Sequence, residues 1–168
     1  VLEHADIPVI LDADALNLTA RYQLSLSDYS VSLAVTPHLG EMARLCSTDI
    51  SNIASDLISS AEEFARSQNV ICVLKDAGTV VSNGNETYIN TSGNSGMATA
   101  GSGDVLAGIF VGLTAQGMDL FEAAKLAVFL HGRAGDQAAL RYGKRSMTSA
   151  DLIDGLVFIL AGSEDKVM

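Results

Sequence analysis

Residues 94–104 read Asn-Ser-Gly-Met-Ala-Thr-Ala-Gly-Ser-Gly-Asp and continue without a break into Val-Leu-Ala-Gly-Ile-Phe-Val-Gly-Leu at 105–113. The second run predicts a helix over Asp104–Ala115 that is apolar on nearly every side, as expected for a helix in the middle of a protein. A glycine-rich loop that ends at a helix start presents backbone N–H groups that can closely approach an anion. The sequence therefore predicts a phosphate-binding loop before a buried helix.

Asp104 has two readings at this position. A carboxylate in the first turn of a helix stabilises the helix dipole, and capping alone would explain it. A carboxylate beside a bound phosphate can also act as a general base in phosphoryl transfer. Two familiar phosphate motifs are excluded, because Leu106 stands where a dinucleotide fingerprint needs its third glycine and no Gly-Lys-Ser/Thr occurs.

Short apolar runs alternate with helical patterns before this loop, which predicts an α/β fold. Strands are expected at Ile7–Leu11, Leu33–Val35 and Val70–Leu74, and helices at His38–Leu45 and Asp49–Gln68. The first strand is apolar on both faces, as in the interior of a parallel sheet.

Later elements follow from turn and cap residues. Asn83-Gly84 predicts a β-hairpin between Val80-Val81 and Thr87–Ile89. Two further helices are expected at about Leu120–Arg141 and Ser149–Leu160, the second with Ser149 as its N-cap.

Composition narrows the class of protein and its partners. The chain has 168 residues, of which 48% are hydrophobic and 18% charged, enough for one core. Its net charge of −10 argues against nucleic acid and membrane surfaces as partners. Cys46 and Cys72 lie outside any zinc-ligand spacing, so we expect free thiols and a cytoplasmic protein. The chain begins with Val1 and soon enters a strand, so we expect it to be part of a larger domain.

Polar residues after the strands are further candidates. Asp12 and Asp14 follow the first strand and could bind a metal or cap a helix. His38 and Lys75 follow the next two strands, where α/β proteins often bind ligands. His131 shares a face with Ala124, Ala127 and Val128, which favours a satisfied core histidine over a ligand.

Four motifs occur together in a known family. The chain resembles the ADP- or ATP-dependent NAD(P)H-hydrate dehydratases of the ribokinase-like superfamily in these motifs, which appear in order across nearly its whole length: Asp12–Asn17, Thr36–Met42, Lys75–Thr79 and Gly96–Asp104. The resemblance implies a three-layer α/β fold with a mostly parallel sheet flanked by helices. It also implies that residues 1–168 are the C-terminal portion of one such domain, with the N-terminal part missing.

The resemblance also implies an activity. ADP or ATP would phosphorylate the hydroxyl of hydrated NADH or NADPH, and phosphate would then leave to restore the reduced nucleotide. Mg²⁺ is expected with the nucleotide. The runner-up is a small-molecule kinase of the same superfamily, such as a vitamin-precursor kinase. A third hypothesis is a nucleotide-binding fragment without activity. The choice between ADP and ATP, the preference for NADH or NADPH, and self-association into a homo-oligomer stay open.

Roles follow from the resemblance residue by residue. Asp104 is the expected catalytic residue. Asp104 and His38 are both expected to contact the substrate. The anion hole would consist of Gly101, Ser102 and Gly103. The nucleotide would contact Gly103 and the segment Lys75, Asp76, Ala77, Gly78 and Thr79. Metal or substrate contacts are expected from Asp12, Asp14, Asn17 and Glu41.

Overall fold

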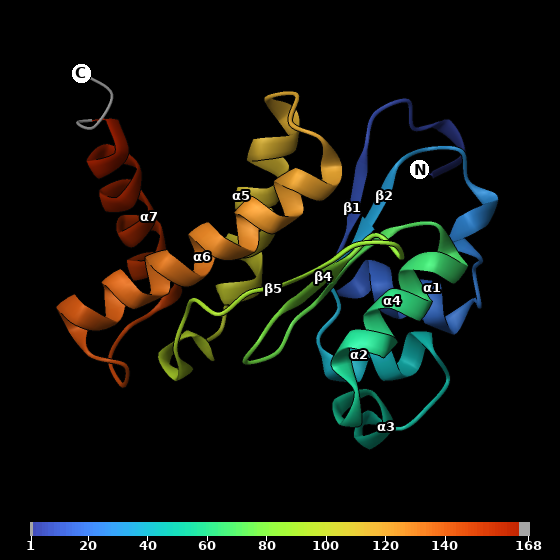
Figure 1. The fold of residues 1–168 in the computed structure, drawn as a ribbon, viewed down its shortest axis with the longest axis horizontal. Helices are drawn as coiled ribbons and strands as arrows, with labels where there is room; N and C mark the ends of the chain where they lie inside the picture. Colours follow the sequence, from blue (N-terminus) through green and yellow to red (C-terminus); the bar gives the residue numbers. More distant parts are fainter. Residues whose placement is uncertain (1, 165–168) are drawn as a thin grey trace.

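The computed structural model describes residues 2–164, which form one five-stranded sheet with helices on both faces (Figure 1). The strands follow the order of the chain across the sheet: β1 (Val9–Leu11), β2 (Leu33–Val35), β3 (Ile71–Leu74), β4 (Val80–Ser82) and β5 (Thr87–Ile89). β1, β2 and β3 run parallel, whereas β4 and β5 are antiparallel to their neighbours. The α/β class and the parallel sheet predicted from the sequence are confirmed.

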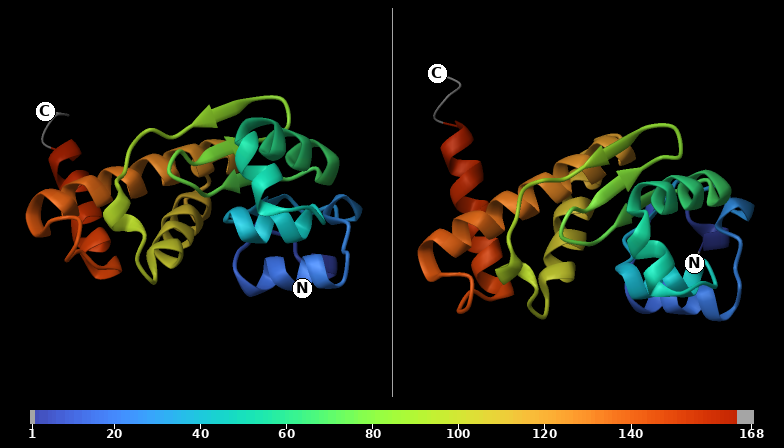
Figure 2. Two further views of the ribbon diagram at one scale, coloured as in Figure 1. Left: turned by 90° about the horizontal axis from the view of Figure 1, so that it is seen from below. Right: turned by 60° about the horizontal axis from the view of Figure 1, so that its bottom comes forward.

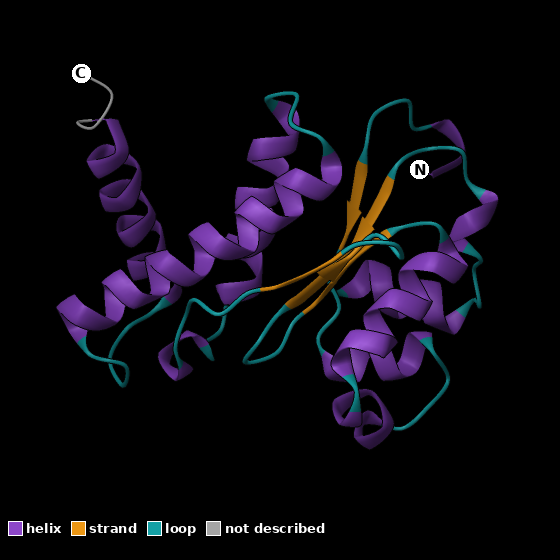
Figure 3. Ribbon diagram, in the orientation of Figure 1, coloured by secondary structure: helices purple, strands orange, loops and turns teal. Residues whose placement is uncertain are grey.

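The helices form two layers around this sheet (Figures 2 and 3). One layer contains α1 (Asp14–Arg21), α2 (Leu39–Leu45), α3 (Ile50–Ser55) and α4 (Leu57–Gln68). The other contains α5 (Ser102–Ala115) and α6 (Leu120–Tyr142), and α7 (Ser149–Glu164) packs on α6 far from α1–α4 (Figure 1). None of the described helices is both long and apolar enough to cross a membrane.

The period of two along each strand divides the core into two parts. On β2, Leu33 and Val35 join the apolar cluster shared with α1, α2 and α4, while Ala34 joins the cluster shared with α5 and α6. On β3, Leu74 belongs to the first cluster and Val73 to the second. The central strands are therefore buried on both faces, as their continuous apolar runs predicted.

The first strand differs from its prediction. It begins at Val9 instead of Ile7, and Ile7 is 68% exposed. β1 pairs only with β2 and is an edge strand, in which Val9 and Ile10 are half-buried. Its side chains still pack on both faces of the sheet, with Val9 and Leu11 against one apolar cluster and Ile10 against the other, so only the bounds of the strand differ from the prediction.

The predicted helix Asp49–Gln68 is two helices, separated at Asp56. The Asp56 backbone leaves the helical region, and its carboxylate accepts a hydrogen bond of 3.0 Å from the Ser59 N–H. A short acidic side chain that bonds to nearby backbone competes with a continuous helix. The hairpin, in contrast, is confirmed, because β4 pairs with β5 around a turn in which Gly84 has a φ of 88°.

The two helices near the phosphate loop also need correction. α5 begins at Ser102, and only Ser102, Leu106 and Phe110 are buried on it, whereas Val111 is 52% exposed. The prediction of a helix buried on nearly every side is wrong for the described residues. α7 begins at Ser149 as expected, but the capping contact is made one residue earlier, where the Thr148 N–H donates to Asp151 Oδ2 at 2.7 Å.

Candidate active site

The carboxyl ends of β1, β2 and β3 bring three sequence motifs together. Lys75 follows β3, and its Nζ donates to Asp12 Oδ1, just after β1, at 2.8 Å. The Lys75 N–H donates to the Pro37 carbonyl at 2.8 Å, and the Lys75 backbone forms an isolated parallel bridge with His38. This edge of a parallel sheet is where α/β proteins bind ligands.

His38 is the N-cap of α2. Its Nδ1 accepts hydrogen bonds from the backbone N–H groups of Gly40 and Glu41, at 2.9 and 3.2 Å. Glu41 Oε2 accepts from the His38 N–H at 2.8 Å, which completes a capping box. The His38 side chain is 54% exposed, and its Nε2 lies 3.5 Å from Glu41 Oε1. Because Nδ1 accepts hydrogen bonds, Nε2 is the ring nitrogen that can donate one. Glu41 itself is buried, and its carboxylate contacts the backbone N–H and the ring of His38.

The other acidic and amide candidates do not converge. Asp14 is exposed at the start of α1, and Asn17 Oδ1 accepts from Arg44 Nε at 3.0 Å. Ala13, between Asp12 and Asp14, has a φ of 49° and a ψ of −117°, a conformation that strains an L residue and is frequent at ligand sites. Within the part of the chain that the structure describes, no group of three or more His, Cys, Asp or Glu side chains could hold a metal ion.

Space and backbone conformation both restrict the residues of the glycine-rich loop. Gly101 has a φ of 83°, and a Cβ at this position would lie 2.8 Å from Ser149 Oγ, so both backbone and space require glycine. Gly103 and Asp104 lie in the first turn of α5, where backbone N–H groups have no helical carbonyl to bind. A Cβ on Gly103 would lie 3.7 Å from Lys75 Nζ, which places an ammonium group beside these amides.

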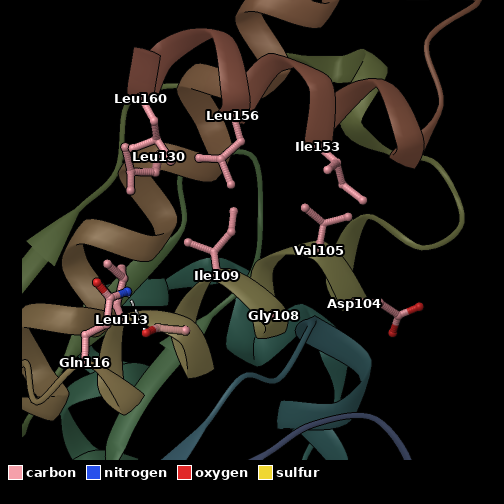
Figure 4. A pocket seen from close by; sticks show the side chains of 11 residues that line it. Asp104, Val105, Gly108, Ile109, Leu113, Gln116, Leu130, Ile153, Leu156 and Leu160 are labelled. Carbon is pink, nitrogen blue, oxygen red and sulfur yellow. Dashed lines mark hydrogen bonds between the residues drawn. The ribbon is translucent and has the colours of Figure 1, made fainter. Parts of the chain in front are cut away.

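Asp104 is exposed at the same helix start. Its Oδ2 lies 4.0 Å from the position of a Cβ on Gly101, so the carboxylate borders the loop. Figure 4 shows the carboxylate at the end of α5, pointing away from the apolar side chains of Ile109 and Leu156. A carboxylate beside unpaired amides can accept a proton from a hydroxyl that attacks a phosphate held there.

The segment Lys75–Thr79 forms the exposed turn between β3 and β4. Thr79 Oγ1 donates to the Asp76 carbonyl at 3.2 Å, and the Asn90 N–H donates to the Thr79 carbonyl at 2.9 Å. Asp76 and Ala77 are exposed, while Gly78 and Thr79 are half-buried. The turn is thus held by hydrogen bonds at Thr79, while Asp76 and Ala77, which follow Lys75, are exposed to solvent.

Sequence reasoning missed the contacts that α6 makes with the loop. Asp136 accepts hydrogen bonds from the Gly93 N–H through Oδ2 and from Asn94 Nδ2 through Oδ1, both at 3.1 Å. A Cβ on Gly132 would lie 2.7 Å from the backbone carbon and oxygen of Ser92. The spacing His-Gly-x-x-Gly-Asp at 131–136 was the available signal, since small residues on one helix face allow close approach.

His131 is the second residue whose site contact was missed. It is half-buried, as a core histidine would be, but its Nε2 lies 3.3 Å from Ser102 Oγ in the proposed anion hole. Burial lowers the pKa of His131 to about 4; a hydrogen bond with the Ser102 backbone opposes this shift and the Lys75 charge adds to it. The imidazole is therefore neutral at pH 7.

An apolar groove of about 650 Å³ runs from Asp104 along the outer side of α5 (Figure 4). It lies between α5 and α7, and its lining is almost entirely aliphatic: Val105, Ile109, Leu113, Leu130, Ile153, Leu156 and Leu160. Part of the side of α5 that was expected to be buried faces this groove.

Comparisons with known proteins agree with this arrangement. Residues 1–157 match the family model described as NAD(P)H-hydrate dehydratase. A bifunctional NAD(P)H-hydrate repair enzyme of Moorella thermoacetica is 44% identical over 168 residues, which are 99% of this chain and 32% of that protein. The ADP/ATP-dependent NAD(P)H-hydrate dehydratase of Bacillus subtilis, co-crystallised with ATP/Mg²⁺, superimposes with a TM-score of 0.87 and 27% identity, over 96% of this chain and 57% of that chain.

A ribokinase-like superfamily protein of Enterococcus faecalis superimposes with a TM-score of 0.77 and 28% identity, over 91% of this chain and 52% of that chain. The fold is therefore ribokinase-like, as the motifs implied. The chain spans about a third of the Moorella protein and just over half of the Bacillus chain. With the family model matching nearly all of its length, the chain belongs to the NAD(P)H-hydrate dehydratase family.

Proposed function

We propose that the protein carries out the ADP- or ATP-dependent dehydration of NAD(P)H hydrate to NADH or NADPH. The observation that carries this proposal is the meeting of Asp104, the first-turn amides of α5 and the Lys75 ammonium at one point. A phosphoryl group held by such amides and ammonium lies next to a carboxylate that can accept a proton.

The proposed reaction has two steps, a phosphoryl transfer and an elimination. Asp104 accepts the proton from the substrate hydroxyl while that oxygen forms a bond to the terminal phosphorus, and the bond from phosphorus to the nucleoside phosphate breaks. The amides of the Gly101–Gly103 loop and Lys75 stabilise the charge on the transferred group. The C–O bond then breaks with its electron pair leaving on phosphate, water takes a proton from the neighbouring carbon, and the electron pair of that C–H bond forms the ring double bond.

The remaining positions supply binding. The Lys75–Thr79 turn takes the nucleotide, and the exposed imidazole of His38 contacts the hydrate. Mg²⁺ enters with the nucleotide, because phosphate oxygens supply most of its ligands and a protein adds one or two carboxylates. Asp12 and Asp14 would hold it at the carboxyl edge of the sheet, and the ion would neutralise phosphate charge.

The test uses hydrated NADH and hydrated NADPH with ADP or ATP and Mg²⁺. We expect the absorbance of the reduced nicotinamide to recover, with one phosphate released for each molecule restored. Accumulation of a stable phosphorylated product without recovery would instead identify a small-molecule kinase. Nucleotide binding without any turnover would identify a binding module.

We also propose that residues 1–168 are the C-terminal portion of one domain and that the rest of the domain covers the groove and the β1 edge. Apolar side chains on α7 support this, since Ile153, Val157 and Phe158 are 53–63% exposed. Exposed apolar strips and strand edges promote association. Residues 1–168 alone should therefore associate and lack repair activity, whereas the complete protein should be monodisperse. A cooperatively unfolding monomer of residues 1–168 would contradict the proposal.

A further inference from the structure

His131 on α6 faces the first residue of α5. Its Nε2 lies 3.3 Å from Ser102 Oγ, within hydrogen-bond distance. Ser102 is only 9% exposed, and the buried Val128 and Gly132 flank the histidine on α6. The two residues therefore meet in a confined space and not at a mobile surface.

Ser102 stands between two glycines that form the rest of the anion hole. Glycine has the widest choice of backbone conformations, so Gly101 and Gly103 do not by themselves hold the loop in one orientation. The Ser102 N–H donates to the Thr99 carbonyl at 3.2 Å, which fixes one side of the residue. The imidazole contacts the Ser102 hydroxyl, and so holds the residue from α6 as well.

We propose that His131 is a positioning residue of the anion hole, which holds Ser102 and thereby keeps the Gly103 N–H directed at the bound phosphate. The Gly103 N–H belongs to the planar peptide that starts at Ser102, so contacts at both the Ser102 N–H and its hydroxyl restrain the direction of that N–H. Donors that are oriented before the ligand arrives bind it more tightly, because no reorganisation is needed.

A neutral ring suits this role at a phosphate site that already contains an ammonium group. A neutral imidazole has one donor and one acceptor nitrogen, and a hydroxyl such as that of Ser102 can pair with either. Lys75 supplies the positive charge beside Gly103. His131 adds orientation without competing with Lys75 for the phosphate.

The inference rests on the proposed nucleotide site, so the test measures the affinity of Mg-ADP and Mg-ATP by calorimetry in the complete protein. His131→Leu removes both ring nitrogens, whereas His131→Gln keeps a polar amide near the position of Nε2. Val128→Ala, one turn away in the core, is the matched control for lost packing. We expect His131→Leu to weaken nucleotide binding about tenfold, the effect of one lost hydrogen bond, and His131→Gln to restore most of it.

Val128→Ala should lower the melting temperature and leave nucleotide affinity unchanged. The Gly103 amide resonance in the nucleotide-free protein should shift in His131→Leu and return toward its original position in His131→Gln. Equal affinities of the original protein and His131→Leu, or an equal loss in Val128→Ala, would overturn the inference while leaving the proposed function intact. If the original protein binds no nucleotide, the proposed function fails, and the inference fails with it.

Discussion

Lys75 Nζ lies 2.8 Å from Asp12 Oδ1 and also beside Gly103, so one ammonium group joins the end of β1 to the start of α5. Both side chains of the ion pair are partly buried, at 21% and 18% exposure. Asp12 holds the lysine in an extended position next to the first-turn amides. We therefore propose that Lys75 contacts the phosphate as well as forming part of the nucleotide-binding turn.

Replacing Lys75 by Met should weaken Mg-ADP binding at least about tenfold, because a charge-assisted contact to phosphate is lost. The loss in stability should stay near 1 kcal/mol, the usual size for a partly exposed ion pair. Lys125→Met is the control, since Lys125 forms a 2.6 Å ion pair with Glu122 on α6 away from the loop. Calorimetric titration that gives equal affinities for the two variants would remove Lys75 from the phosphate site.

A methyl group at Gly103 should leave folding unchanged but weaken nucleotide binding. A Cβ there would be in ordinary contact with Lys75 Nζ, at 3.7 Å, so Gly103→Ala should fold normally. The added carbon blocks close approach of phosphate to the amides, and the β-branched side chain of Gly103→Val blocks it further. We expect nucleotide affinity to fall in the order Gly, Ala, Val, while Gly162→Ala, which meets open space on α7, leaves it unchanged. An unchanged affinity in Gly103→Val would place the phosphate elsewhere.

Asp104→Asn should abolish repair turnover while nucleotide still binds. The amide has nearly the shape of the carboxylate but cannot accept the hydroxyl proton. Single-turnover assays with hydrated NADH, together with a nucleotide titration of the same preparation, separate the two effects. Turnover within about tenfold of the original rate would show that Asp104 only caps α5.

Local patterns predicted most of the fold. β2 was placed correctly because a fully buried parallel strand is a continuous apolar run, and the hairpin was placed because Asn83-Gly84 favours a tight turn. The errors have two causes: side chain–backbone hydrogen bonds that interrupt a regular element, and packing partners that the local sequence does not reveal. Asp56 divides a helix through its own carboxylate, and the exposure of β1 and α5 depends on what packs against the outside of the sheet and helix.

The site was predicted only in part, because its contacts join residues far apart in the chain. Glycines before a helix predicted the loop at Gly101–Gly103. No local pattern pairs Lys75 with Asp12, which are 63 positions apart, or His131 with Ser102, which are 29 apart. Apolar neighbours on α6 favoured a core histidine, and burial of the ring agrees with that reading. Its polar contact depends on the packing of α6 against α5, which no local pattern predicts.

Gly132→Ala should destabilise the protein through the loop that precedes the anion hole. The added Cβ would lie 2.7 Å from Ser92 backbone atoms, which cannot rotate away as a side-chain end can. Overpacking of this kind costs about 1–3 kcal/mol. Gly162→Ala should instead be neutral or slightly stabilising, because alanine favours helix. Denaturant unfolding of both variants tests this, and a Gly132→Ala protein as stable as the original would show that the loop is free to move off α6.

The stability of the protein should depend on pH through His131. Its pKa is about 4 in the folded protein, whereas an unfolded histidine titrates near 6.5, so the unfolded chain binds more protons between these values. The contribution is complete above about pH 6.5 and is lost as the pH falls toward 4, by about 3 kcal/mol at most. His131→Gln removes this titration but leaves the acidic groups and Lys75 in place. The difference in unfolding free energy between the original protein and His131→Gln should therefore shrink, or change sign, between pH 7 and pH 4.5. Two parallel stability curves over that range would mean that solvent reaches the imidazole in the folded protein.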